Sequence, residues 1–165
     1  MTTTARTGYC AIFLLSLAML GTSFALEHFW GLTPCPLCLI ARYLVFCLTL
    51  LFGIAWLHNP GKRGRVAYLI FSTLLCLLGI AVTLRHLYIQ HLPPELAPAC
   101  TPGLDYLLET LPVLEAFLVV LHGSGECAKS SGALLGLSLP AWTLLGFIGL
   151  GVLNVWGVFG FKKKG

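Results

Sequence analysis

Residues 35–57 read CPLCLIARYLVFCLTLLFGIAWL. Arg42 is the one charged residue in this run, and a helix of about 20 apolar residues is long enough to cross the hydrocarbon core of a bilayer. Two thiols, Cys35 and Cys38, stand in its first turn, and Arg42 follows one turn later. Pro36 suits a helix start, where a backbone donor is unpaired in any case. The stretch therefore predicts a membrane-spanning helix with a pair of thiols at its beginning.

Three further stretches share this apolar character. We expect the four spans to cover about residues 8–26, 38–57, 66–87 and 141–161. Of the 165 residues, 58% are hydrophobic and 10% are charged, against about 25% charged in a typical soluble domain. This composition excludes a water-soluble globule. The predicted fold class is an all-α membrane protein, an antiparallel four-helix transmembrane bundle formed by a single domain over residues 1–165.

Charges orient the predicted bundle. Four spans place both termini on one side, together with a short connection at about residues 58–65. Basic residues collect on that side, namely Arg6, Lys62, Arg63, Arg65, Lys162, Lys163 and Lys164. The six acids fall on the other side, namely Glu27, Glu95, Asp105, Glu109, Glu115 and Glu126. Because Lys and Arg collect in cytoplasmic loops, we expect both termini in the cytoplasm. The net charge of +4 then reflects membrane topology, and nothing in the pattern indicates a nucleic-acid partner.

The first span allows a second interpretation. Arg6, an apolar run and the sequence Ser23-Phe24-Ala25 could form a secretory signal with its cleavage site. The run is longer than the usual hydrophobic region of about 7–15 residues, which favours a retained span. Its removal would leave the orientation of the other three spans unchanged.

Two loops lie on the outer side of the membrane in this topology. The first is short, at about residues 27–37, and the second, at about 88–140, is much longer. The second begins with a proline-rich segment and continues with leucines at helical spacing on both sides of Pro112. We expect it to carry at least one short amphipathic helix on the membrane surface. A small lid packed on itself is the alternative.

The seven cysteines divide by location. Three lie inside predicted spans, where a thiol behaves as a small inert hydrophobic group: Cys10, Cys47 and Cys76. Cys47 follows Cys38 by nine residues, which turns it to the opposite face of the helix. The other four lie outside the cytoplasm, in a compartment where disulfides persist: Cys35, Cys38, Cys100 and Cys127.

Three interpretations of the four external cysteines are open. Two static disulfides could staple the loops. A tetrahedral zinc site is the second, although structural zinc sites usually bring ligands in closely spaced pairs, and only Cys35 and Cys38 are so spaced. A redox relay is the third, because a helix N-terminus favours the thiolate, which is the form that attacks disulfides. In a relay, Cys100 and Cys127 on the long loop would be the pair that an outside partner reaches.

Arg42 favours the relay. A charge inside a membrane span is costly and therefore indicates a function. Arg42 shares a helix face with Cys38, four residues before it, and an arginine there could hold a thiolate or donate to a carbonyl oxygen of a bound quinone. Snorkelling of Arg42 to the lipid headgroups is the alternative. His86, near the outer end of the third span, lies at a matching depth and would face the second helix if the two are neighbours.

With these residues assembled, the chain closely resembles the DsbB family of bacterial inner-membrane proteins, which use quinone to reoxidise the periplasmic dithiol oxidase DsbA. The resemblance covers essentially the whole chain. It rests on Cys35-Pro36-Leu37-Cys38 with Arg42, and on His86 with Gln90 at the end of the third span. Further matching segments are Pro98-Ala99-Cys100, Gly103-Leu104-Asp105-Tyr106, Gly125-Glu126-Cys127-Ala128, and residues 135–142, which read LGLSLPAW.

The resemblance implies a role for each external cysteine. Cys100 and Cys127 would form the disulfide that receives electrons from a DsbA-like thiol oxidase, with Cys100 trapped in the mixed disulfide. Cys35 and Cys38 would re-form that bond, and Cys38 would pass the electrons to the quinone. The pairing at rest stays open, between Cys35–Cys38 with Cys100–Cys127 and a bond between the two loops.

The resemblance also implies the partners of the protein. The electron acceptor would be ubiquinone, or menaquinone when oxygen is scarce, with Arg42 as the main quinone contact and His86 beside the ring. The partners would be a periplasmic DsbA-like oxidase, the membrane quinone pool and, through that pool, the respiratory chain. No metal is expected. The location would be the bacterial inner membrane.

Two positions depart from the family pattern. Many relatives carry an acid directly before the arginine, where this chain has Ala41. Many also have an aromatic residue soon after the last cysteine, where this chain reads Ser130-Ser131-Gly132. The first departure leaves open whether any acid tunes Arg42.

Two other functions are considered. A vitamin K epoxide reductase-like enzyme is also a small quinone-linked bundle, but its Cys-x-x-Cys sits late in the bundle, whereas here the pair opens the second span. A structural or assembly protein with four spans would use the external cysteines as static staples.

Overall fold

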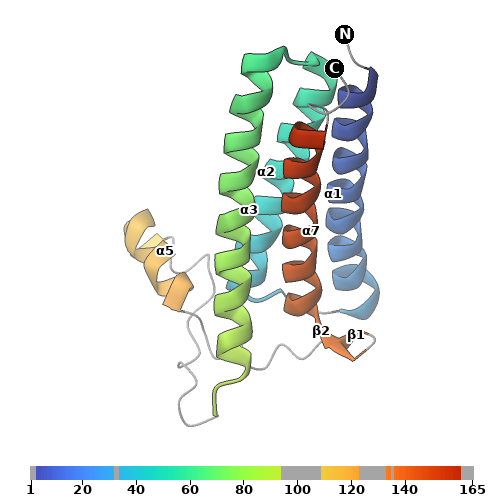
Figure 1. Ribbon diagram of the computed structural model, residues 1–165. Helices are drawn as coiled ribbons and strands as arrows, with labels where there is room; N and C mark the ends of the chain where they lie inside the picture. The colour runs from blue at the N-terminus through green and yellow to red at the C-terminus, as the bar shows by residue number, and fades with distance from the viewer. Residues whose placement is uncertain (1–2, 32–33, 94–108, 123–132, 135, 161–165) are drawn as a thin grey trace.

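The computed structural model of the protein describes residues 3–31, 34–93, 109–122, 133–134 and 136–160. Its main body consists of four long helices: α1 (Thr3–Trp30), α2 (Pro36–His58), α3 (Lys62–Gln90) and α7 (Leu139–Gly160). Successive long helices run in opposite directions, so that α1 begins and α7 ends at the same end of the bundle (Figure 1). All four are long and apolar enough to cross a membrane. The predicted antiparallel four-helix fold is confirmed.

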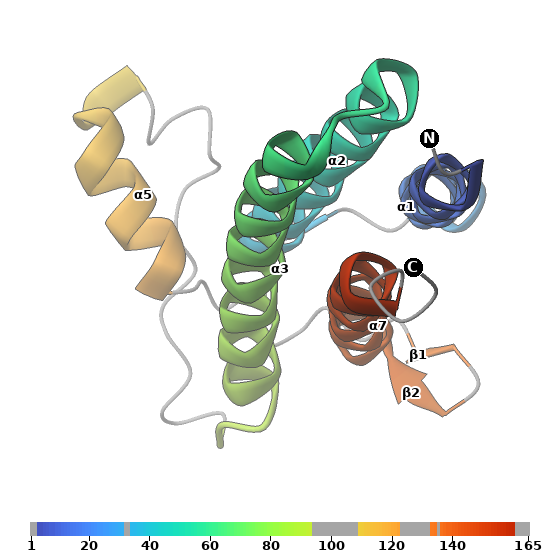
Figure 2. The same cartoon turned by 45° about the horizontal axis from the view of Figure 1, so that its top comes forward.

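The four helices form a closed ring of neighbours. Helix α1 packs against α2, α2 against α3, α3 against α7, and α7 back against α1. Figure 2 shows this arrangement obliquely from one end of the bundle, with α1 and α3 on opposite corners. The α2–α3 contact matters most for function, because it brings the start of α2 beside the end of α3.

The α2–α3 connection is short because its sequence ends one helix and begins the next. Asn59 adopts a left-handed backbone with φ 44°, which asparagine tolerates better than most residues. Its N–H donates to the carbonyl of Ala55 at 2.9 Å, and Pro60 cannot continue the helix. Helix α3 begins at Lys62, so the basic residues at 62–65 lie in its first turn rather than in a loop.

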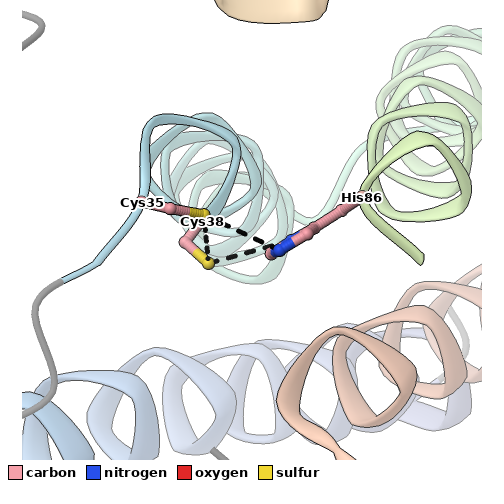
Figure 3. Close-up of side chains that lie close together, drawn as sticks. All are labelled: Cys35, Cys38 and His86. Carbon is pink, nitrogen blue, oxygen red and sulfur yellow. Dashed lines mark hydrogen bonds between the residues drawn. The ribbon is translucent and has the colours of Figure 1, made fainter. Parts of the chain in front are cut away.

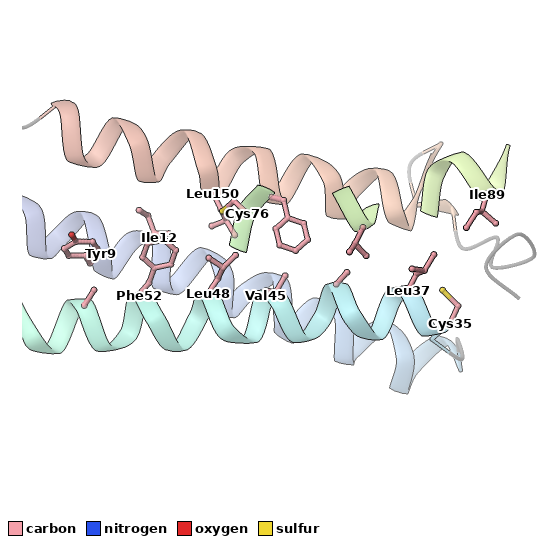
Figure 4. Close-up of a cluster of buried hydrophobic side chains, with 14 residues drawn as sticks. Tyr9, Ile12, Cys35, Leu37, Val45, Leu48, Phe52, Cys76, Ile89 and Leu150 are labelled. Atoms are coloured by element: carbon pink, nitrogen blue, oxygen red, sulfur yellow. The ribbon is translucent and has the colours of Figure 1, made fainter. Parts of the chain in front are cut away.

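Apolar side chains line the inside of the bundle. Phe52, Leu48 and Leu37 on α2 are fully buried, as is Phe147 on α7; Figure 4 shows the three α2 residues along the inner face of their helix. The outward faces are also apolar and exposed, with Leu50, Ile54, Ile70, Phe71, Leu77, Val152 and Trp156 among them. Exposed apolar faces around a packed core are what a helix bundle needs in a lipid environment.

Buried hydroxyls within the spans are satisfied by their own helices. Ser72 Oγ donates to the carbonyl of Tyr68 at 2.6 Å, and Thr83 Oγ1 donates to the carbonyl of Gly79 at 2.7 Å. Such local bonds matter because lipid offers no alternative partner.

Two smaller elements lie between α3 and α7 in sequence. Helix α5 (Val113–His122) begins directly after Pro112 and packs through Val120 against Ile40 of α2. Leu114 and Leu118 are exposed on it, as expected of an interfacial helix, and the short helix predicted in the second loop is confirmed. The strands β1 (Ala133–Leu134) and β2 (Leu137–Ser138) pair antiparallel just before α7. This hairpin was not predicted, because two-residue strands are too short for an alternating pattern.

Candidate active site at the start of α2

Cys35 and Cys38 are brought together by the first turn of α2. Cys35 is the N-cap residue, and its carbonyl accepts from the N–H of Leu39 at 3.1 Å. Pro36 occupies the first position of the helix, where its fixed φ is already helical. The Cys35 thiol donates to Cys38 Sγ across 3.1 Å. A disulfide needs about 2.05 Å, so the two sulfurs are roughly one ångström from bonding distance.

His86 of α3 lies against both sulfurs. Its Nε2 is 3.7 Å from Cys35 Sγ, and its Nδ1 is 3.9 Å from Cys38 Sγ. Figure 3 shows the ring reaching across from α3 to the two thiols at the start of α2. Both Cys35 and His86 are 3% exposed. A neutral imidazole can take a proton from a thiol through one nitrogen, and the tautomer decides which nitrogen is the acceptor.

Arg42 lies one turn further along α2 and turns toward α1. Its Nε donates to Ser23 Oγ at 3.0 Å, and its Nη1 donates to Glu27 Oε2 at 2.5 Å. The guanidinium carbon also lies 4.6 Å from the ring centroid of Phe24. The Arg42 side chain is 15% exposed and that of Glu27 is 40% exposed. The cation is therefore paired inside the bundle through contacts from a single neighbouring helix.

The structure brings together only part of the predicted site. Cys35, Cys38 and His86 form one cluster, and Arg42 follows on the same helix. We expected His86 at the depth of Arg42. It lies instead directly against Cys35 and Cys38, at the level of the first turn of α2. Cys100 and Cys127 lie outside the described residues.

Three site residues were missed at the level of sequence, namely Ser23, Phe24 and Glu27. Glu27 entered the argument only as one of the acids that orient the bundle. The sequence could have indicated this contact, because the last turns of one span and the first turns of the next lie at the same end of an antiparallel pair. Glu27 and Arg42 are therefore expected at a similar depth in the membrane. Ala41 is buried and carries no acid, so the carboxylate beside Arg42 comes from α1 instead of from the preceding residue.

The cysteines within the spans stand apart from this cluster. Cys47 is exposed on the outer surface of α2, and Cys76 is buried in the core, where it lies near Gly151 of α7. That these cysteines take no part in redox chemistry stays a prediction.

Fold and site together define a class of protein, a multi-pass helical membrane protein with a pair of thiols beside a histidine at one end of its bundle. Comparison with known sequences narrows this class. The family model described as Disulfide bond formation protein DsbB matches residues 5–157. The chain belongs to the DsbB family.

Relatives named Disulfide bond formation protein B match over most of their length. The protein of Chromohalobacter salexigens is 49% identical over 140 residues, covering 84% of this chain and 81% of the relative. That of Stutzerimonas stutzeri is 38% identical over 151 residues, covering 92% and 93%. That of Hahella chejuensis is 42% identical over 146 residues, covering 88% of each. This chain is thus a disulfide bond formation protein with the oxidoreductase role that the family name implies.

Proposed function

We propose that the protein is a thiol:quinone oxidoreductase that reoxidises a periplasmic DsbA-like dithiol oxidase and passes the electrons to ubiquinone or menaquinone. One observation carries the proposal: the sulfurs of Cys35 and Cys38 touch each other and a buried histidine at the start of a helix built to cross a membrane. A thiol pair in that position can reach both an aqueous loop and a lipid-soluble electron acceptor.

The outer disulfide, Cys100–Cys127, would accept electrons from the partner protein. A thiolate of the reduced partner attacks Cys100, and the Cys127 thiolate leaves. The second partner thiolate then attacks the partner sulfur of the mixed disulfide, so the partner leaves oxidised and Cys100 and Cys127 are both reduced. Each exchange conserves electrons, because one disulfide breaks for each one that forms.

The inner disulfide, Cys35–Cys38, would receive the same two electrons by a second exchange. When Cys35 and Cys38 re-form their disulfide, they lose two electrons and two protons. The quinone is the electron acceptor, and with two electrons and two protons it becomes the quinol. His86 lies 3.7 Å from Cys35 Sγ and 3.9 Å from Cys38 Sγ, so it can take up a thiol proton as the electrons leave.

Arg42 would orient the quinone. Nε and Nη1 are held by Ser23 and Glu27, and within the part of the chain that the structure describes Nη2 makes no hydrogen bond. That nitrogen is a donor for a carbonyl oxygen. Arg42 follows Cys38 by four residues, so the two side chains start from neighbouring positions on α2, and a quinone that accepts from Arg42 would lie one turn from Cys38.

The proposal includes the placement of the protein. A single DsbB-like domain over residues 1–165 would lie in the bacterial inner membrane, with both termini cytoplasmic and the Cys35–Cys38 end periplasmic. The quinone pool would connect it to the respiratory chain.

Turnover of the purified protein tests the proposal. Reduced DsbA-like partner and ubiquinone are mixed with the protein, and loss of quinone absorbance is followed. Cys38→Ser should reduce turnover to the rate without protein, because the inner disulfide cannot form. Cys47→Ser is the matched control, since this thiol lies on the outer surface of the same helix, and it should turn over normally. Full turnover in Cys38→Ser would contradict the mechanism.

A further inference from the structure

We propose that Cys35, Cys38 and His86, when the two cysteines are reduced, form a three-ligand site for a thiophilic divalent cation such as Zn²⁺. Binding of the cation would hold the pair in the reduced state and so inhibit the enzyme. The binding step is independent of the proposed function, and only the inhibition rests on it.

The donor atoms are of the right kind. Two thiolates and one imidazole are preferred zinc ligands, and a Cys₂His set with a water in the fourth position is known from catalytic zinc sites. The interpretation of zinc from sequence required all four external cysteines. The structure instead groups the inner pair with a histidine 48 residues away from Cys38.

The donor atoms also lie at nearly the right distances. Tetrahedral zinc with bonds of about 2.3 Å to sulfur and about 2.05 Å to nitrogen separates two sulfurs by roughly 3.8 Å, and a sulfur from the nitrogen by roughly 3.6 Å. The sulfurs are 3.1 Å apart, Cys35 Sγ is 3.7 Å from His86 Nε2, and Cys38 Sγ is 3.9 Å from the other ring nitrogen, Nδ1. One atom from each residue can be chosen so that all lie within 4.8 Å of one another. To hold a cation, the sulfurs would move apart by roughly 0.7 Å from their 3.1 Å separation, and one ring nitrogen of His86 would turn toward both.

Charge and burial favour the cation as well. Two thiolates and one dication sum to zero, and a neutral cluster avoids the large cost of an unpaired charge in a buried position. The start of α2 also favours the thiolates, because the helix dipole is positive at the N-terminus and Cys35 is the N-cap residue. Cys35 and His86 are almost fully buried, so two of the three ligands are held in place by packing before a cation arrives.

Oxidation and metal binding exclude each other at this site. A cation is bound by two thiolates. Disulfide formation joins the same two sulfurs, so that neither remains a thiolate. Binding releases the protons of the two thiols and changes no oxidation state. The reduced enzyme would therefore bind the cation, and the oxidised enzyme would not.

Cobalt titration of the reduced protein tests the site, because thiolate-to-cobalt charge-transfer absorption reports sulfur ligation directly. The background carries Cys100→Ser and Cys127→Ser, so the outer pair cannot bind, and the protein is otherwise full length in detergent. One Co²⁺ per protein should bind with this absorption, and Zn²⁺ should displace it. Oxidation of the same sample to the Cys35–Cys38 disulfide should abolish the absorption.

Histidine variants test the third ligand. His86→Ala should weaken Co²⁺ binding at least tenfold, and His86→Gln serves as a second variant that keeps more of the buried volume. His91→Ala is the matched control, because His91 caps the end of the same helix, is exposed, and directs its ring Nδ1 to the backbone carbonyl of Leu87 at 2.8 Å. Equal affinity in the wild type and both His86 variants, or no thiolate–cobalt absorption in reduced protein, would overturn the inference.

Turnover with added Zn²⁺ separates this inference from the proposed function. Inhibition that a chelator reverses supports both. Normal turnover that micromolar Zn²⁺ leaves unchanged, with no cobalt binding, contradicts the inference and leaves the function standing. Cobalt binding by a protein that does not oxidise its partner supports the site and contradicts the function.

Discussion

Arg42 illustrates how spacing along one helix leaves the partners of a side chain undetermined. Its spacing from Cys38 predicts a shared helix face, but its hydrogen-bond partners come from another helix, α1. Ser23 and Glu27 each accept a hydrogen bond from the guanidinium, and Phe24 stacks near it. The absence of an acid at Ala41 therefore does not leave the cation unpaired, because α1 supplies a carboxylate at the same depth.

Glu27→Gln tests whether this contact positions Arg42 for the quinone. An ion pair that is partly exposed contributes up to about 1 kcal/mol, so we expect the quinone KM to rise roughly fivefold. Thiol exchange with the partner protein should be unchanged, because the outer cysteines do not use Arg42. Steady-state kinetics with varied ubiquinone and with varied partner separates the two effects.

Two further variants serve as a stronger change and as a control for Glu27→Gln. Arg42→Met should raise the quinone KM more than Glu27→Gln does, and the exposed acid Glu115 of α5, changed to glutamine, should have no effect. Unchanged quinone saturation in both Arg42→Met and Glu27→Gln would mean that the arginine is only a structural cation.

At the scale of the elements, the α3–α7 contact depends on a glycine, Gly79, which has no side chain. A methyl group at Gly79 of α3 would overlap the ring of Phe147, which is fully buried on α7. Small residues at helix contacts let backbones approach closely, and in lipid this packing replaces the hydrophobic effect as the main attraction between helices. Because α3 also carries His86, this contact helps to fix the depth of the ring beside the thiols.

Gly79→Ala should therefore destabilise the bundle even though alanine is the better helix former. Overpacking a core costs about 1–3 kcal/mol, which corresponds to a fall in the thermal midpoint of several degrees for a protein of this length. Gly149→Ala on α7 is the control, because an added methyl there has no atom within 4 Å. Thermal unfolding in detergent measures both, and equal midpoints for Gly79→Ala and the wild type would refute this account of the contact.

Local signals in the sequence predicted much of the fold, and the limits of those signals explain what was missed. Pro36 and the Asn59-Pro60-Gly61 turn mark where helices begin and end, since backbone chemistry acts over a few residues. The contact of His86 with Cys35 and Cys38 depends on how α2 and α3 pack, which periodicity does not specify. Likewise α3 extends to Gln90, beyond the span predicted to end at about residue 87. Its last turn includes Ile89, which is fully buried, and a hydropathy pattern does not register that packing.

Across the whole molecule, the basic α2–α3 turn and the thiol pair lie at opposite ends of the bundle. The α2–α3 turn, which leads into Lys62 and Arg63, lies at the end where α1 begins and α7 ends (Figure 1). The cysteine pair, His86 and Glu27 lie at the other end. Since basic segments stay in the cytoplasm, the thiols should face the oxidising compartment, where a disulfide they form would persist.

Reporter fusions to the full chain test this orientation in bacterial cells. Alkaline phosphatase is active only after export, because it needs disulfides that the cytoplasm does not allow. We expect a C-terminal alkaline phosphatase fusion to be inactive and a C-terminal green fluorescent protein fusion to fluoresce. Alkaline phosphatase inserted after Ser124, in the long loop, should be active. The reverse pattern would place the cysteines in the cytoplasm, where the glutathione pool keeps thiols reduced and a disulfide-generating role would have no use.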